Sequence, residues 1–212
     1  MVRVRPTPDI RLCFLGDSFT LGVGDETGRG WVGRVVEQAR GAGANLTAYN
    51  LGVRRETAVD IDRRWIAEVT PRLRDGDAYG VVQAVGVNDT ALEQGQRRLP
   101  THGTLRRLER VVEGTRSRHW PLLVIGPALV GEPEHNERIL DLSAHLSEAC
   151  RAAGVAFTEI AHGLVDDDAW LADVNAVDGA HPTRAGYARL ADIIWPAFAG
   201  WLQTLGSQGE PL

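Results

Sequence analysis

Short apolar runs alternate with longer amphipathic segments along most of this chain. Five runs have the length and composition of buried strands: residues 12–15, 45–51, 79–85, 121–125 and 155–158. Residues 79–85 are almost continuously apolar, which is typical of a strand covered on both faces of a sheet. The first run ends at Gly16, where the chain is expected to turn.

The longer segments have the spacing of amphipathic helices, with apolar residues three and four positions apart. These segments are residues 31–40, 57–73, 105–118 and 136–153, and a last one that opens at Thr183. Gly154 directly follows one segment and is a typical helix end. Pro196 is expected to break or kink the last helix before residues 198–205, and residues 206–212 are expected to form a frayed tail.

This alternation of strands and helices predicts an α/β fold, in which helices cover both faces of a parallel sheet. Residues 1–212 fit one domain, a three-layer α/β/α sandwich. Five strands match the flavodoxin-like order 2-1-3-4-5. In that order the first and third strands are neighbours, and their carboxyl ends flank the point where ligands bind. We therefore looked for chemistry directly after these two strands.

Composition narrows the function classes. The formal net charge is -5 and all 23 basic residues are arginine, so nucleic-acid binding and lysine-based chemistry are disfavoured. The two cysteines, Cys13 and Cys150, are expected to be buried free thiols, and no metal site or cofactor is predicted. With no signal peptide or membrane-length apolar stretch in the sequence, we expect a cytoplasmic location and no stable membrane insertion.

Two motifs supply a nucleophile and a base. Ser18 lies two residues beyond the first strand, where its hydroxyl and the backbone N–H groups of the turn share one space. Asp178 and His181 are three residues apart just before the last helix, so the carboxylate can reach the imidazole and orient it. Taken alone, the Ser18 motif is more typical of an ordinary strand end, whereas the Asp178–His181 motif fits a simple turn and helix start equally well.

Two further turns offer hydrogen-bond donors. Asn88 follows the third strand, and its side-chain amide can donate to an oxyanion. Gly52 ends the second strand, where a backbone N–H can approach a ligand closely. Both could instead be simple turn residues. Taken together, however, the turns present a nucleophile, an oriented base and donors for developing negative charge, as acyl transfer requires.

These motifs resemble the signature blocks of the SGNH (GDSL-type) hydrolases, in the order of that family: residues 16–19 (GDSF), 50–52 (NLG), 86–89 (GVND) and 178–182 (DGAHP). The resemblance implies a catalytic triad of Ser18, Asp178 and His181, with an oxyanion hole formed by Ser18, Gly52 and Asn88. It implies a serine esterase or acyl hydrolase that cleaves carboxylic esters through an acyl-enzyme. Carbohydrate O-acetylesterase and acyl thioesterase activities remain alternatives, as does a non-catalytic flavodoxin-like binding module.

The chain departs from the family pattern at two positions that supply no catalytic atom. Phe19 replaces the leucine of the GDSL motif, and Val87 replaces a frequent glycine.

Arg54 and Arg55 follow the Gly52 turn and could contact an anionic part of a small-molecule substrate. The favoured interpretation is instead surface pairing with one of three nearby acids: Glu56, Asp60 and Asp62. The loop over residues 127–135 could overhang the site.

Overall fold

A computed structural model describes residues 7–206 of the chain. Its main sheet is parallel and five-stranded, with the order β2-β1-β3-β6-β7. The strands are β1 Ile10–Gly16, β2 Leu46–Gly52, β3 Ala78–Ala84, β6 Leu122–Ile125 and β7 Ala156–Thr158. This order is the predicted 2-1-3-4-5 arrangement, because β4 (Leu92–Glu93) and β5 (Gln96–Arg97) form a separate antiparallel hairpin.

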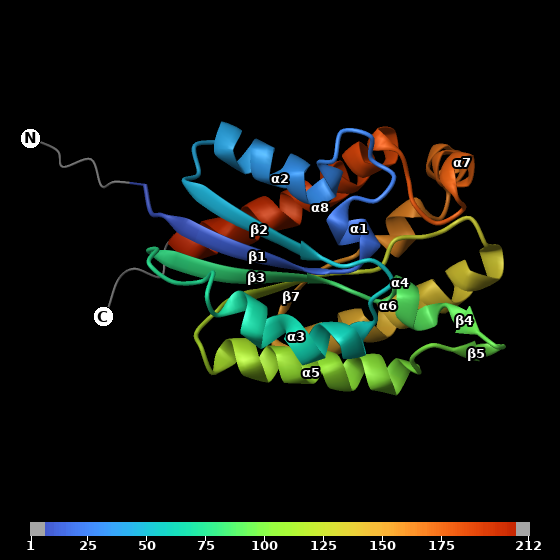
Figure 1. Ribbon diagram of the computed structural model, residues 1–212, viewed down its shortest axis with the longest axis horizontal. Helices are drawn as coiled ribbons and strands as arrows, with labels where there is room; N and C mark the ends of the chain where they lie inside the picture. Colours follow the sequence, from blue (N-terminus) through green and yellow to red (C-terminus); the bar gives the residue numbers. More distant parts are fainter. Residues whose placement is uncertain (1–6, 207–212) are drawn as a thin grey trace, which may run out of the picture.

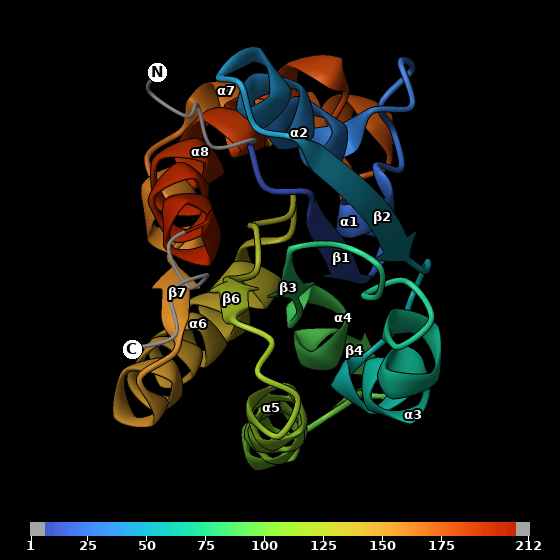
Figure 2. The ribbon, with the colours of Figure 1, turned by 90° about the vertical axis from the view of Figure 1, so that its left-hand side faces the viewer.

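Helices cover both faces of the sheet, and the expected three layers are visible when the molecule is viewed from its side (Figure 1, Figure 2). On one face α2 packs along α8, and on the other face α3 packs along α5. The helices are α1 Ser18–Leu21, α2 Gly30–Gly41, α3 Ala58–Val69, α4 Val87–Thr90, α5 Thr101–Arg116, α6 Pro133–Ala153, α7 Asp168–Val177 and α8 Arg184–Gly206, with a 3-10 turn, η1, at Ala161–Leu164.

Alternate residues of β1 supply the two apolar cores. Leu12 and Phe14 point into the core under α2 and α8, whereas Cys13 and Leu15 point into the core under α3 and α5. Both cysteines are free and fully buried, as expected. Burial raises the pKa of the Cys13 thiol to about 12, so this group is an inert core residue.

Helix boundaries differ from the sequence prediction where proline is involved. The helix expected over residues 57–73 ends at Val69, because Pro71 has no N–H with which to continue the hydrogen-bond ladder. The predicted break at Pro196 is absent, since α8 runs through it. Ile194 and Phe198 are buried on either side of this proline, and their packing holds the helical course.

Several elements near the sheet edge had no counterpart in the sequence prediction: α1, α4, α7, η1 and the β4–β5 hairpin. The loop expected over residues 127–135 ends earlier, because α6 begins at Pro133. Of the expected frayed tail, Gly206 ends α8, and residues 207–212 lie outside the described part. Within residues 7–206, no helix has the length and apolar character needed to span a membrane.

Candidate active site

The strand register brings distant turns together at one edge of the sheet. Gly16 of β1 pairs with Gly52 of β2, and Leu15 pairs with Gln83 of β3. The chain leaves β1 through Asp17, whose side chain caps α1 by accepting the Phe19 N–H at 2.9 Å. This cap starts α1 at residue 18 and holds the Ser18 side chain at the carboxyl edge of the sheet.

The imidazole of His181 bridges Ser18 and Asp178. Its Nε2 lies 2.8 Å from Ser18 Oγ, and its Nδ1 lies 2.8 Å from Asp178 Oδ2. Asp178 Oδ1 accepts the backbone N–H groups of Ala180 at 2.9 Å and of His181 at 2.8 Å. These hydrogen bonds lower the pKa of Asp178 to about 2, against the opposing effect of desolvation, so the carboxylate is ionised at neutral pH.

The segment that carries His181 is held from both sides. Asp173 of α7 accepts the Thr183 N–H at 2.8 Å and the Gly186 N–H at 3.1 Å, which fixes the first turn of α8. On the other side, Gly131 donates its N–H to Gly179 O at 2.8 Å. The loop after β6 therefore supports the histidine segment, and α7 sets its position.

Gly52 and Asn88 lie at the same edge but are already hydrogen-bonded. The Gly52 N–H donates to Asn50 Oδ1 at 3.0 Å. Asn88 Nδ2 donates to Asp17 Oδ2 at 3.0 Å and to Glu56 O at 3.1 Å. Only glycine fits at position 52, because a Cβ there would lie 2.8 Å from the Asp17 carbonyl oxygen.

Two carboxyl groups are buried directly beneath these turns. Burial raises the pKa of Asp17 to about 7 and that of Asp89 to about 6, and the proximity of Asp89 adds to the shift of Asp17. Asp89 accepts hydrogen bonds from Ala58 N at 3.2 Å and from Thr104 Oγ1 at 2.9 Å. Thr104 lies inside α5 and therefore links this helix to α4.

An open cleft of about 360 Å³ lies in front of Ser18 and His181. Arg54, Arg55 and Arg98 line it, together with Leu92 and other residues of the hairpin segment. The surface pairing expected for Arg54 and Arg55 is wrong. The three nearby acids bond to other groups: Glu56 to Arg64, Asp60 to Thr57 and Arg63, and Asp62 to Arg107 and Arg110.

A comparison with protein families agrees with this geometry. The model of the GDSL-like lipase/acylhydrolase family matches residues 14–189, a span that includes all four turns described above. The chain belongs to this family. No curated protein sequence matches it.

Solved structures share the fold of this GDSL-family chain at low sequence identity. A lipase/acylhydrolase from Enterococcus faecalis has a TM-score of 0.75 at 23% identity, covering 90% of this chain and 95% of that one. TesA has a TM-score of 0.74 at 20% identity, covering 90% and 99%. The acetylxylan esterase Axe2 from Geobacillus stearothermophilus has a TM-score of 0.68 at 19% identity, covering 88% and 93%.

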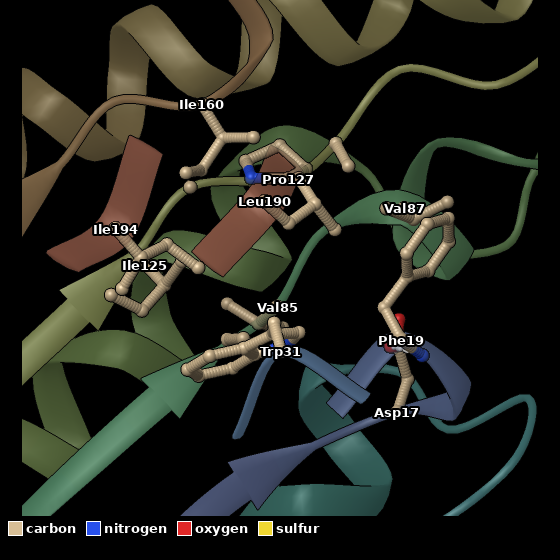
Figure 3. A pocket seen from close by; sticks show the side chains of 13 residues that line it. Asp17, Phe19, Trp31, Val85, Val87, Ile125, Pro127, Ile160, Leu190 and Ile194 are labelled. Atoms are coloured by element: carbon tan, nitrogen blue, oxygen red, sulfur yellow. Dashed lines mark hydrogen bonds between the residues drawn. The ribbon is translucent and has the colours of Figure 1, made fainter. Parts of the chain in front are cut away.

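This family member also has a small apolar cavity of about 20 Å³ behind the cleft (Figure 3). Phe19 and Val87 line both the cleft and this cavity, so they form the wall between them. The Phe19 ring also lies 5.5 Å from the His181 ring, centroid to centroid. The two positions at which the chain departs from the family motifs thus lie in one wall of the site.

One residue near the site was missed by the sequence analysis. His135 is buried, and its Nε2 lies 3.1 Å from Val87 O and 3.0 Å from Thr90 Oγ1, so it fixes the short helix that carries Asn88. Burial lowers its pKa, which favours a neutral ring. No sequence signal identified this contact, because the two segments are far apart in the chain.

Within residues 7–206, no cluster of side chains is arranged to hold a metal ion.

The buried carboxyl of Asp17 makes the stability of this protein depend on pH. Its pKa is about 7 in the folded state and near 3.8 in an unfolded chain. Between these values the folded state holds a proton that the unfolded state has lost, so stability falls as pH rises, by at most ~1.4 kcal/mol per pH unit for one proton.

We therefore expect Asp17→Asn to reduce this slope between pH 4 and pH 7, as measured by urea unfolding. Asp89 has a shift of the same sign, so part of the slope remains in the variant. If the free energy of unfolding changed with pH in the same way in the wild type and the variant, Asp17 would not be the group that holds the extra proton in the folded state.

Proposed function

We propose that this protein is a serine esterase that hydrolyses carboxylic esters through an acyl-enzyme, with Ser18 as nucleophile, His181 as base and Asp178 as the orienting carboxylate. One observation carries the proposal: two hydrogen bonds of 2.8 Å link Ser18 Oγ, the His181 ring and Asp178 Oδ2 in a continuous chain. An ionised carboxylate at Nδ1 holds the imidazole in the tautomer whose Nε2 accepts the serine proton.

The proposed reaction has two steps. Ser18 Oγ attacks the ester carbonyl while its proton passes to His181 Nε2. When the tetrahedral intermediate collapses, the bond to the alcohol breaks, and the alcohol leaves with the proton from His181. Water then attacks the acyl-enzyme with His181 again as base, which releases the carboxylic acid and restores Ser18.

The developing oxyanion is proposed to be bound by the backbone N–H groups of Ser18 and Gly52 and by the Asn88 amide. Support comes from their common position at the sheet edge. The Gly52 N–H is hydrogen-bonded to Asn50, and the Asn88 amide is hydrogen-bonded to Asp17 and Glu56. On substrate binding each would share its proton with the oxyanion or exchange partners, since catalytic hydrogen bonds tighten and realign in the reactive complex.

The family and the structural relatives indicate ester chemistry but do not single out one ester. The names of the structural relatives include a lipase/acylhydrolase and an acetylxylan esterase. We propose a small carboxylic ester as substrate, because the apolar space next to the cleft has a volume of only about 20 Å³. Acyl thioesters and sugar acetates would use the same chemistry, and a panel of these three substrate types separates them. A non-catalytic module would need neither a paired serine nor an oriented imidazole.

Replacing the nucleophile tests the proposal directly. Ser18→Ala should reduce the hydrolysis of 4-nitrophenyl acetate to background, because the proposed acyl-enzyme forms on the Ser18 hydroxyl. A fluorophosphonate probe should label the wild type at Ser18 and should not label the variant. Circular dichroism would confirm that the variant is folded. Retained turnover in a folded, pure variant would exclude Ser18 as the nucleophile.

Replacing the orienting carboxylate should slow the reaction without unfolding the protein. In Asp178→Asn the charge is lost and the imidazole is left without its anionic partner, so kcat should fall by ~10²–10⁴ while KM changes little. Since the Asp178 side chain is 45% exposed, we expect near-normal thermal stability. A variant that unfolds, or one that keeps full kcat, would contradict the assigned role.

A further inference from the structure

Two arginines at the mouth of the cleft have no ionic partner. Arg54 and Arg55 are exposed residues that line the cleft in front of Ser18, and neither forms an ion pair with a residue between 7 and 206. Arg55 has a φ of 67°, a left-handed backbone conformation that is unusual for arginine. The turn after Gly52 thus places two consecutive arginines in the lining of the cleft that also contains Ser18.

The acids that could neutralise these arginines are used elsewhere. Arg64 binds Glu56 at 2.6 Å, and the side chains of both residues are largely buried. Arg107 and Arg110 of α5 both bind Asp62 at 3.2 Å. These pairs lie between helices or along them, so the charges of Arg54 and Arg55 remain available to a ligand.

A third arginine adds to the positive charge of the cleft. Arg98 also lines it, and its nearest acid, Glu93, is 3.9 Å away with a side chain that is 67% exposed. The cleft residues thus include three arginines against two acids, Glu93 and Asp178. Asp178 is engaged with His181. The rest of the molecule is acidic, since the net charge of the chain is -5. The cleft is therefore positively charged, whereas the protein as a whole is negatively charged.

We propose that Arg54 and Arg55, supported by Arg98, bind an anionic group of the substrate, so that the enzyme prefers esters that carry a carboxylate or phosphate near the scissile bond. This rests on the proposed esterase function. Guanidinium groups bind both anions through charge-assisted and often bidentate hydrogen bonds. The positive cleft also attracts an anionic ester toward a protein whose overall charge would repel it.

Matched ester pairs test the preference. On the acyl side, mono-4-nitrophenyl fumarate, whose trans carboxylate cannot attack its own ester, is compared with neutral methyl 4-nitrophenyl fumarate. On the alcohol side, 4-acetoxybenzoate is compared with methyl 4-acetoxybenzoate. In at least one pair, kcat/KM should favour the anionic ester by about ten-fold, as expected for hydrogen bonds to a charged group. The pair that responds shows on which side of the ester the anion lies.

Variants that remove one charge each show which arginines cause the preference for anionic esters. Arg54→Gln and Arg55→Gln should each lower the anionic-to-neutral ratio of kcat/KM, and the double variant should bring it close to one. Arg74→Gln is the matched control, because Arg74 is exposed in the loop before β3, at the amino edge of the sheet. The ratio should also fall as salt is raised from about 10 mM to 500 mM.

The outcomes separate the two proposals. Hydrolysis of the neutral esters with no preference in either pair, or a preference that survives in the double variant, would overturn the role of the arginines and leave the esterase intact. An absence of hydrolysis for every ester would reject the esterase itself.

A second inference rests on Phe19 and Val87, which line the apolar cavity (Figure 3) and also line the cleft. The cavity is lined by Trp31, Ile125 and Leu190, among others, and its volume of about 20 Å³ holds no acyl chain. A single water molecule needs on the order of 10–15 Å³. Phe19 and Val87, which are 6% and 8% exposed, separate this apolar space from the cleft.

We infer that Phe19 and Val87 set an upper limit on acyl-chain length by closing the cavity. Phe19→Leu and Val87→Ala remove atoms from the wall and should join the cavity to the cleft. The ratio of kcat/KM for 4-nitrophenyl octanoate to that for 4-nitrophenyl butyrate should rise about ten-fold in the double variant, since each methylene buried in an apolar pocket adds to transition-state binding.

Phe19 also packs on His181, so its replacement is expected to change kcat/KM for both esters by the same factor. The ratio of the two kcat/KM values therefore reports the chain-length preference alone. Val112→Ala serves as the control, since Val112 is a buried valine in the core under α3 and α5, on the other face of the sheet. An unchanged ratio in the double variant, with butyrate hydrolysis retained, would show that the wall does not limit the acyl chain.

Discussion

The parallel register of β1 with β2 and β3 is the constraint on which the rest of the structure depends. Gly16 lies opposite Gly52, and Leu15 lies opposite both Leu51 and Gln83. Because parallel strands end at a common edge, this register brings three turns from distant parts of the chain side by side. A slip of one residue would exchange the side chains that β1 presents to the two apolar cores. The apolar pattern of β1 therefore fixes the position of the site as well as the core.

Buried carboxyl groups turn this shared edge into a rigid frame. Asp17 links α1 to Asn88, and Asp89 links α4 to α3 and α5 through its hydrogen bonds with Ala58 and Thr104. Buried charge is costly, and the raised pKa values of both groups reflect that cost. Each carboxyl is nevertheless hydrogen-bonded, and through these bonds the frame holds the candidate oxyanion donor Asn88 in place.

Local pattern was enough to predict the sheet, because strand periodicity and turn position are local properties. The pairing of Ser18 with His181 was expected from the resemblance to the family, since the two residues lie far apart in the chain. The β4–β5 hairpin was missed, since strands of two residues carry no periodicity. Helix α7 was also missed, although Asp167 accepts the Trp170 N–H and is a recognisable N-cap signal. The hydrogen bonds made by Asn88, and the contact of His135 with α4, depend on packing between distant segments and have no local signature.

The arginines show why proximity in sequence is a poor guide to ion pairing. Glu56, Asp60 and Asp62 are close to Arg54 and Arg55 along the chain, yet the packing of α3 against α5 directs Asp62 toward Arg107 and Arg110. The free charge at the cleft is thus a consequence of tertiary structure. It lies on the turn after β2, whereas the proposed triad lies after β1 and before α8. The proposed substrate recognition and the proposed acyl transfer thus lie on separate loops of one scaffold, so either could change while the other is kept.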